Sequence, residues 1–301
     1  MRKMECFKIQ VLETENPFEL SNAKVVNNIK CGPFNKSIEP NTIIADPFLY
    51  IHNDMLYMFY ESKKMYRKGT ISMICTKDLI KWSEPITVLS EKCHLSYPWV
   101  FKENDKVYMI PETCELGEIR LYEANKNLTE FKYVKTLLKD DIKHRNGFSF
   151  SDSSIYKKDN LYYLITTTND EEKNILHLYV SDSIMGEYKK HIKSPICIGN
   201  KYGRNAGCFL RYRNKLFRVA QDCDIKYGND VNLFEIKQIS DKEYTEELIK
   251  RNLINNITDY YKDGGHQYNF VKYKGKYIVA TDAKEYHYLI LNKIFHKLKK
   301  Y

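Results

Sequence analysis

Asp46-Pro47-Phe48-Leu49-Tyr50, a turn at His52-Asn53-Asp54, and then Leu56-Tyr57-Met58-Phe59-Tyr60-Glu61 form the clearest structural signal in the chain. Two runs rich in aromatic and β-branched residues surround a turn of Asn and Asp, which is the sequence pattern of a β-hairpin. Similar hairpins are expected near residues 97–112, 152–167, 207–222 and 267–282. The copies begin roughly 50 to 60 residues apart, a period typical of the blades of a propeller.

Five such repeats predict an all-β fold, a five-bladed β-propeller that occupies residues 1–301 as a single domain. The 25 tyrosines and 14 phenylalanines suit pleated, half-buried surfaces better than helices. Residues 7–12 alternate as a strand should, and we expect this strand to complete the last blade and close the ring. Residues 241–253 are predicted to form a short helix on the rim of a blade.

The end of the chain carries a different pattern. Lysines alternate with apolar residues at helical spacing, namely Lys293, Lys297, Lys299 and Lys300 around Ile290, Leu291, Ile294, Phe295 and Leu298. This predicts a short basic amphipathic C-terminal helix, which either packs under the propeller or makes a weak contact with a membrane surface.

The composition limits the classes of partner and the cellular compartment that we expect for this protein. The formal net charge of +9 favours an acidic partner such as a sugar nucleotide or an anionic membrane face, and the chain has no nucleic-acid-binding motif. Residues 1–7 lack an apolar signal core, and no apolar run approaches the roughly 18 residues of a membrane span. The eight cysteines are scattered without a Cys-x-x-Cys pair, which favours reduced thiols. We therefore expect a cytoplasmic protein, which is either unattached or peripheral to a membrane.

The inner strands of a propeller converge on its axis, so polar residues at the strand starts should meet in one funnel. Those residues are Asp46, Tyr97, Asp152, Arg204, Asn205 and His266. The second strand of each hairpin returns to the same face and brings further polar residues toward the rim, namely Glu61, Glu112, Gln221, Asp222 and Asp282. Carboxylates buried in an apolar core without a partner are costly, so this gathering of polar residues indicates a functional site.

Several phrases of the sequence resemble one known family. They are Ala45-Asp46-Pro47-Phe48, residues 56–61, 94–98, 108–112, 118–122, 204–207, 221–223 and 227–228, and then His266 and Asn269. In order and content they resemble the N-terminal propeller domain of the glucosamine inositolphosphorylceramide transferase family, within the five-bladed superfamily of furanosidase-type glycoside hydrolases. In the plant members a separate glycosyltransferase domain follows the propeller. The resemblance implies work on carbohydrate and leaves transfer, hydrolysis and binding open.

The resemblance to the hydrolases places the catalytic base at Asp46 and a second, tuning aspartate at Asp152. The same hydrolases carry a glutamate in the third or fourth blade as general acid. The fourth blade here has Gly203-Arg204-Asn205-Ala206-Gly207 instead. A hydrolase needs a proton donor for its leaving group, whereas a nucleotide diphosphate leaving group needs charge neutralisation, which an arginine supplies. Glu61 or Glu112 remains an alternative acid.

The leading hypothesis is therefore a glycosyltransferase that moves a sugar from a nucleotide sugar, a UDP-sugar first, to a surface glycan or glycolipid. Asp46 or Asp152 would deprotonate the acceptor, and Arg204, with Arg120, would hold the diphosphate. The other expected substrate contacts are His94, Tyr97, Glu112, Asn205, Gln221, Asp222, His266 and Asn269. A furanosidase-like glycoside hydrolase and a non-catalytic carbohydrate-binding module that serves other glycosyltransferases are the alternatives.

We expect no cofactor and no metal site. Asp222-Cys223-Asp224 is the one pattern that resembles a metal-nucleotide motif of glycosyltransferases. Those enzymes have a nucleotide-binding α/β fold, so a divalent metal is the lesser alternative.

Overall fold

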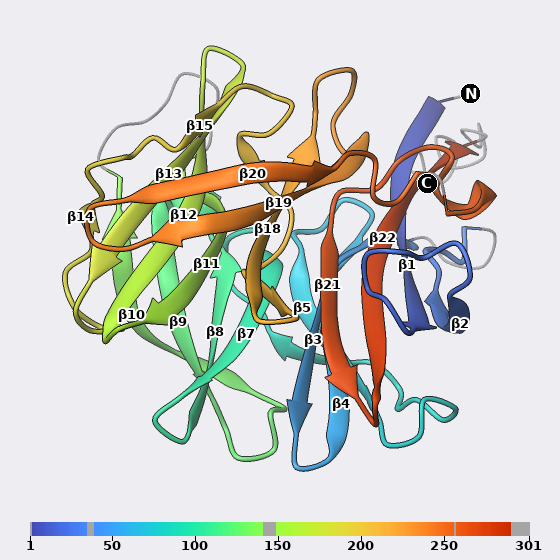
Figure 1. Cartoon of the computed structure of the whole chain (residues 1–301). Coiled ribbons are helices and arrows are strands. Elements are labelled where there is room, and N and C mark those ends of the chain that lie inside the picture. The colour runs from blue at the N-terminus through green and yellow to red at the C-terminus, as the bar shows by residue number, and fades with distance from the viewer. Residues whose placement is uncertain (1, 35–38, 141–148, 256, 290–301) are drawn as a thin grey trace, which may run out of the picture.

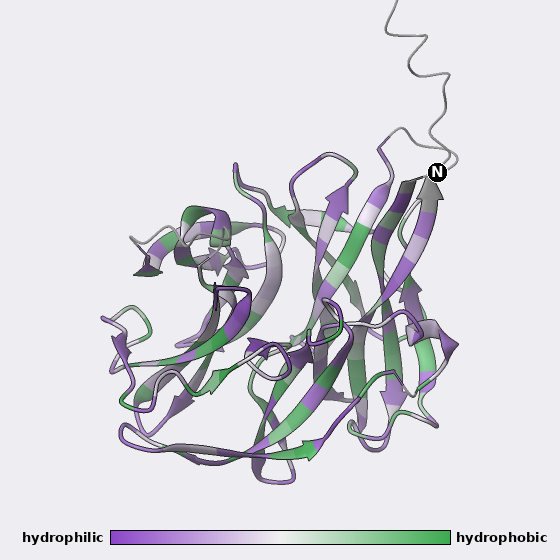
Figure 2. Cartoon of the chain, turned by 90° about the horizontal axis from the view of Figure 1, so that it is seen from above, coloured by the Kyte–Doolittle hydropathy of each residue, from purple (hydrophilic) through white to green (hydrophobic). Residues whose placement is uncertain are grey.

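The chain folds into five blades of antiparallel strands around a central axis, and the predicted fold class is confirmed (Figure 1). The computed structural model describes residues 2–34, 39–140, 149–255 and 257–289. The amphipathic helix expected over residues 290–300 lies outside the described residues. Viewed from above, polar and apolar residues alternate along many of the strands, as they should when each sheet packs against its neighbours (Figure 2).

The strands follow one another blade by blade. Blade one contains β3 (Asn41–His52), β4 (Met55–Lys64), β5 (Thr70–Thr76) and β6 (Ile86–Leu89). Blade two contains β7 (Ser96–Glu103), β8 (Lys106–Glu112), β9 (Glu118–Ala124) and β10 (Phe131–Lys139). Blade three contains β11 (Ser151–Lys158), β12 (Leu161–Asp170), β13 (Lys173–Ser181), β14 (Lys189–Lys190) and β15 (Cys197–Ile198).

Blade four contains β16 (Arg204–Asn205), β17 (Leu210–Tyr212), β18 (Lys215–Asp222), β19 (Asp230–Ile239) and β20 (Tyr244–Lys250). Blade five contains β21 (Tyr268–Tyr273), β22 (Lys276–Leu289), β1 (Arg2–Thr14) and β2 (Lys24–Ile29). Two short 3₁₀ turns, η1 (Cys114–Leu116) and η2 (Asp259–Tyr261), lie in the connections. In the described part of the chain, no helix is long and apolar enough to cross a membrane.

All five hairpins turn in the same way at one end of the propeller. The two central residues of each turn have positive φ: Asn53 and Asp54, Asn104 and Asp105, Asp159 and Asn160, Arg213 and Asn214, and Lys274 and Gly275. Positive φ at both positions defines the type I′ turn, whose twist matches that of the flanking strands. The hairpins predicted from the sequence are therefore present, and their turns are equivalent.

The opposite end of the inner strands is irregular in the first three blades. Asp46, Tyr97 and Asp152 have φ values of 52°, 46° and 55°, in the left-handed region. At each of them the strand register shifts, so the pairing with the partner strand is interrupted by a bulge. A bulge of this kind bends the strand and redirects its side chain.

The N-terminal strand closes the ring, as the sequence predicted. β1 pairs antiparallel with β22 from Arg2↔Leu289 to Thr14↔Tyr277, and Figure 1 shows the two strands side by side. β1 also touches β3 through the parallel pair Phe7↔Ile43, so blades one and five share one hydrogen-bonded sheet. The two ends of the described chain are thereby held in the same blade.

Blade four departs from the sequence-based expectation in two places. The helix predicted over residues 241–253 is wrong, because this segment contains β20, which pairs with β19 and alternates its side chains between more and less exposed positions. The inner strand is broken into β16 and β17, both of which pair with β18. Gly207 lies in the break, where a Cβ would collide with the Tyr268 carbonyl oxygen. The close approach of blade five therefore accompanies the interruption of the strand.

Candidate functional site

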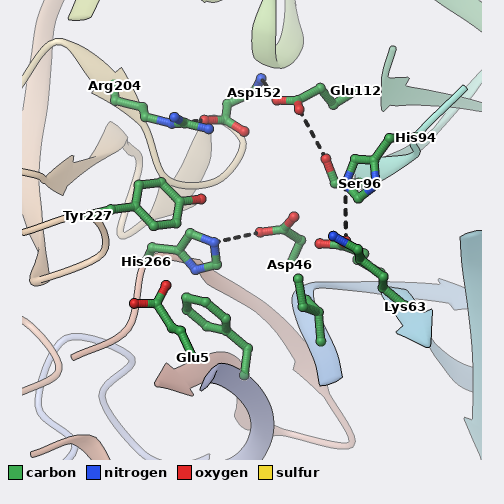
Figure 3. A pocket seen from close by; sticks show the side chains of 13 residues that line it. Glu5, Asp46, Lys63, His94, Ser96, Glu112, Asp152, Arg204, Tyr227 and His266 are labelled. Atoms are coloured by element: carbon green, nitrogen blue, oxygen red, sulfur yellow. Dashed lines mark hydrogen bonds and ion pairs between the residues drawn. The ribbon is translucent and has the colours of Figure 1, made fainter. Parts of the chain in front are cut away.

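A cavity of about 200 Å³ opens at the bulged end of the blades. Thirteen residues, contributed by all five blades and their connections, line it: Glu5, Phe7, Ile43, Asp46, Glu61, Lys63, His94, Ser96, Glu112, Asp152, Arg204, Tyr227 and His266. Figure 3 shows ten of them converging, and Asp152 beside Arg204 lies on the far side of the cavity from Lys63. The structure thus brings Asp46, Asp152, Arg204 and His266 together in one cavity, as the convergence of the strands predicted.

Asp46 is fixed by the blades on both sides. Its backbone N–H donates to Asp282 Oδ2 at 3.1 Å, and its Oδ2 accepts the Tyr97 N–H at 3.0 Å. The remaining oxygen, Oδ1, lies 3.6 Å from His266 Nε2. Burial raises the pKa of Asp46 well above its ordinary value, and the positive charge of His266 acts in the opposite sense. Asp46 therefore has the environment of a carboxylate that accepts a proton readily.

His266 lies between two carboxylates. Its Nδ1 is 2.7 Å from Asp282 Oδ2, and its Nε2 faces Asp46. Burial alone would lower the pKa of His266, but the charges of Asp282 and Asp46 outweigh it and raise the pKa to about 9. The imidazole is therefore charged at neutral pH, and it lies between the two carboxylates. The Phe7 ring packs on it, with ring centroids 4.6 Å apart.

Asp152 and Arg204 form the second charged pair of the cavity. Arg204 Nε donates to Asp152 Oδ2 at 2.6 Å, and Gln221 Nε2 donates to the same oxygen at 3.2 Å. The guanidinium carbon lies 5.1 Å from the centre of the Tyr227 ring. Burial raises the pKa of Asp152 to about 6 although Arg204 opposes that shift. The ion pair and the ring together set the plane of the guanidinium.

Two glutamates occupy the wall formed by blades one and two. His94 Nδ1 accepts the Gly69 N–H at 2.9 Å, so its Nε2 carries the proton that faces Glu61 Oε1 at 3.2 Å. Glu112 accepts the Ser96 hydroxyl at 3.2 Å through Oε1 and the Asp152 N–H at 3.3 Å through Oε2. Both carboxylates are almost fully buried yet reach the cavity.

Side chains near the cavity also join neighbouring blades. Asp282 accepts the Asp46 N–H, Asp46 accepts the Tyr97 N–H, and Glu112 accepts the Asp152 N–H. The Thr167 hydroxyl continues the series by accepting the Asn205 N–H at 3.1 Å. Buried polar groups normally have such partners. These carboxylates therefore hold the propeller together as well as forming the cavity.

Six of the predicted site residues do not line the cavity: Tyr97, Arg120, Asn205, Gln221, Asp222 and Asn269. Tyr97 is fully buried, its hydroxyl donates to the Gly207 carbonyl at 2.6 Å, and it presents no face to a sugar. Asn205 Nδ2 donates to the Tyr97 hydroxyl and to the Asp152 carbonyl. Asn269 accepts the Leu49 N–H at 2.8 Å. These side chains contact neighbouring blades instead, where they position the residues of the cavity.

Arg120 and Asp222 are engaged elsewhere. Arg120 Nε donates to Glu118 at 2.6 Å, and its guanidinium lies over the Tyr133 ring at 5.2 Å. Asp222 Oδ1 accepts the Asp224 N–H at 3.1 Å, which closes a local turn and leaves Asp224 exposed. Among the described residues, neither Asp222 nor Asp224 belongs to a group of three side chains that could hold a metal ion.

Six lining residues were not anticipated as site residues: Glu5, Phe7, Ile43, Lys63, Ser96 and Tyr227. The sequence carried a signal for the first two, because the alternation of the predicted strand 7–12 puts Phe7 on one face, and Glu5 continues that face. Lys284 lies behind them with 1% exposure, where its Nζ is 3.1 Å from Glu5 Oε2 and donates to the Tyr227 carbonyl.

Asp46, His266 and Asp282 also form a group that could hold a metal ion, because one ligand atom of each lies within 4.8 Å of the others. A metal would have to displace the proton of His266, whose pKa is raised to about 9 by the same two carboxylates. The imidazolium already supplies the positive charge that this cluster of acids requires.

Comparison with known proteins identifies the family to which the chain belongs. Residues 3–280 match the family model described as glucosamine inositolphosphorylceramide transferase 1, N-terminal. The chain belongs to this family. It is 34% identical over 251 residues to glucosamine inositolphosphorylceramide transferase 1 of Arabidopsis thaliana, a match that covers 80% of the chain and 32% of the plant protein. The chain thus spans about a third of the length of the curated relatives that it matches.

Solved structures with the same fold include a levansucrase and a GH43 protein, both of low sequence identity to this chain. A levansucrase of B. megaterium aligns with a TM-score of 0.58 and 12% identity over 83% of this chain and 84% of that one. The GH43 protein BlXynB of Bacillus licheniformis aligns with a TM-score of 0.53 and 18% identity over 70% of this chain and 43% of that one. At this identity the likeness establishes the fold alone.

Proposed function

We propose that the chain is a glycosyltransferase that moves a sugar residue from a nucleotide-sugar donor to a hydroxyl of a glycan or glycolipid acceptor. One observation carries the proposal. Of the described residues, blade four contributes Arg204 and Tyr227 to the cavity, and neither is a carboxylic acid. A guanidinium suits a diphosphate leaving group, which needs its charge neutralised rather than a proton.

Each charged residue then has a stated task. The acceptor oxygen forms a bond to the anomeric carbon of the donor, and the bond from that carbon to the phosphate oxygen breaks. The acceptor proton passes to Asp46, which lines the cavity and whose pKa is raised by burial. The nucleoside diphosphate leaves with the bonding electrons, and Arg204 stabilises its charge. The positive charge of His266 opposes the effect of burial and so favours the ionised form of Asp46 before the transfer.

The size of the cavity limits what it holds. A volume of about 200 Å³ is below the roughly 300–1,000 Å³ typical of sites that enclose a drug-sized ligand. We therefore place the transferred sugar residue inside, the diphosphate beside Arg204, and the nucleoside outside. The family description supplies the first compounds to test, a nucleotide-activated glucosamine as donor and an inositolphosphorylceramide as acceptor.

A glycoside hydrolase is the second candidate, favoured by the presence of Glu61 and Glu112 in the same cavity as Asp46. Either glutamate would act as the general acid that Arg204 cannot replace. The products separate the two reactions. Acceptor-dependent release of nucleoside diphosphate supports transfer, and release of a reducing sugar from an oligosaccharide supports hydrolysis. Saturable glycan binding that is unchanged in Asp46→Asn, without turnover of either kind, would overturn both and leave a binding module.

A further inference from the structure

A cluster of metal-ligating side chains lies on the other face of the β1–β22 pair from the cavity. Cys6 of β1 is paired directly with Glu285 of β22, so both side chains lie on one face, and His287 follows two residues later on that face. Cys31, which follows β2, approaches the same group. The ligand atoms of Cys6, Cys31 and His287 all lie within 4.8 Å of one another.

The spacing within the cluster fits a small tetrahedral site. Cys31 Sγ lies 3.8 Å from His287 Nε2. With Zn–S near 2.3 Å and Zn–N near 2.0 Å, a tetrahedral zinc ion separates such ligand atoms by about 3.5 Å. Glu285 Oε1 lies 2.8 Å from both Cys31 Sγ and His287 Nε2, within reach of the fourth position.

The charges around the cluster favour a divalent ion that converts thiols to thiolates. Lys8 Nζ lies 2.9 Å from Glu285 Oε2 and leaves Oε1 directed at Cys31 and His287. A Zn²⁺ ion, two thiolates, the Glu285 carboxylate and the Lys8 ammonium add up to no net charge, so the ion replaces the two thiol protons without leaving an unbalanced charge. Soft sulfur and imidazole ligands select zinc over magnesium or calcium.

We infer that Cys6, Cys31 and His287, completed by Glu285, form a structural zinc site. It joins three segments of the chain, namely the N-terminal strand, the connection after β2 and the last described strand. The site therefore fastens the closure of the ring. It also supports the strand whose alternate residues, Glu5 and Phe7, form one wall of the cavity.

The test uses the full chain, stripped of metal under reducing conditions and titrated with Co²⁺ as a spectroscopic substitute for zinc. We expect one equivalent to bind with a thiolate-to-metal charge-transfer band that Zn²⁺ then abolishes, and we expect Zn²⁺ to raise the melting temperature. Cys31→Ser and His287→Gln should each weaken binding by more than the about 10- to 100-fold typical of an outer-shell partner. Cys75→Ser is the matched control, because Cys75 is also a half-buried thiol but lies in β5.

Three results would overturn the inference. The first is the absence of stoichiometric Co²⁺ or Zn²⁺ uptake by the reduced wild-type chain. The second is equal uptake by wild type and by folded Cys31→Ser and His287→Gln, with folding judged from their melting temperatures without metal. The third is a Cys6–Cys31 disulfide in protein isolated without reductant, together with no uptake after reduction, which would assign the two thiols to a redox pair.

Discussion

The two ends of the inner hairpins follow opposite rules. At the turn end, all five hairpins have the same type I′ geometry, and their turn residues are Asn, Asp or Gly except for Arg213 and Lys274. At the cavity end, Asp46, Tyr97 and Asp152 share one left-handed bulge, yet they differ in what their side chains contact. Blades four and five supply Arg204 and His266 instead. The turn positions, which carry similar residues in most blades, therefore specify the fold. The positions at the cavity end, whose residues differ from blade to blade, specify the chemistry of the cavity.

The most demanding test of this contrast makes one substitution at both ends of the same strand pair. Asp46 and Asp54 both have left-handed φ, 52° and 60°, a conformation that Asn tolerates. Asp46→Asn removes the proposed base and should lower the transfer rate by about 10²- to 10⁴-fold. Asp54→Asn should leave the rate unchanged. Initial rates of nucleoside diphosphate release measure both variants.

Melting temperatures accompany those rates, because an asparagine at position 46 keeps a carbonyl oxygen that can accept the Tyr97 N–H. Equal rates in the two variants would mean that the bulged end has no special chemical role. A loss of rate in Asp46→Asn that merely parallels unfolding would assign Asp46 to the structure alone.

The second comparison uses two arginines of blade four. Arg204 lines the cavity, whereas Arg211 is exposed near the turn end and donates to the Tyr156 hydroxyl at 2.7 Å. Arg204→Gln should weaken nucleotide-sugar binding by about 10- to 100-fold, as expected for loss of hydrogen bonds to a charged group. Arg211→Gln should bind as wild type does. Calorimetric titration with the donor decides, and similar affinities for the two variants would remove the assigned role of Arg204.

The third comparison is of the pH dependence of kcat/KM when His266 or His52 is replaced. Asp152, with a pKa of about 6, must be ionised to hold Arg204, so kcat/KM should fall below that pH. His266, with a pKa of about 9, must be charged to offset the Asp46 and Asp282 carboxylates and hold Asp46 in place, so kcat/KM should also fall above that pH. A bell-shaped profile follows, with each limb approaching tenfold per pH unit. His52→Gln, at the turn end, should keep this profile, and an unchanged alkaline limb in His266→Gln would refute the assignment.

Stability should follow the same titration. The pKa of His266 is raised on folding from an ordinary value near 6.5 to about 9, so its contribution is complete below pH 6.5. That contribution, on the order of 3 kcal/mol, is lost as the pH rises through 9. The free energy of unfolding of wild type should therefore fall over this range relative to His266→Gln.

The smallest effect concerns a residue that positions others. Tyr97→Phe removes the hydroxyl that joins the Gly207 carbonyl and Asn205, and it should cost about 1–3 kcal/mol of stability. Tyr57→Phe, at a half-buried position nearer the turn end, should change stability by less than about 0.5 kcal/mol. Urea unfolding measures both, and equal costs would remove the distinction between the two ends.

The sequence was sufficient to predict features that depend on a local pattern of residues. The turns follow from Asn, Asp and Gly between β-forming runs, and closure by β1 follows from the alternating pattern of residues 7–12. The convergence of Asp46, Asp152, Arg204 and His266 then follows from the geometry of a propeller.

The sequence was insufficient to predict contacts that depend on the distances between blades. Tyr97 occupies a strand start like that of Asp46, yet its hydroxyl reaches Gly207, where the strand of blade four is broken. Lys63 lines the cavity only because β4 extends beyond Glu61. The cluster around Cys6 and Glu285 depends on the register of β1 against β22, which no local pattern fixes.

The functional proposal depends on the recognition of a nucleotide sugar by Arg204. A thermal-shift panel of nucleotide sugars tests this recognition without any assumption about the acceptor. A ligand that binds only the folded state raises the melting temperature. We predict that at least one nucleotide sugar raises the melting temperature of wild type and of Arg211→Gln, and that the rise is lost in folded Arg204→Gln. A panel that leaves wild type unshifted, or that shifts Arg204→Gln equally, would refute this recognition.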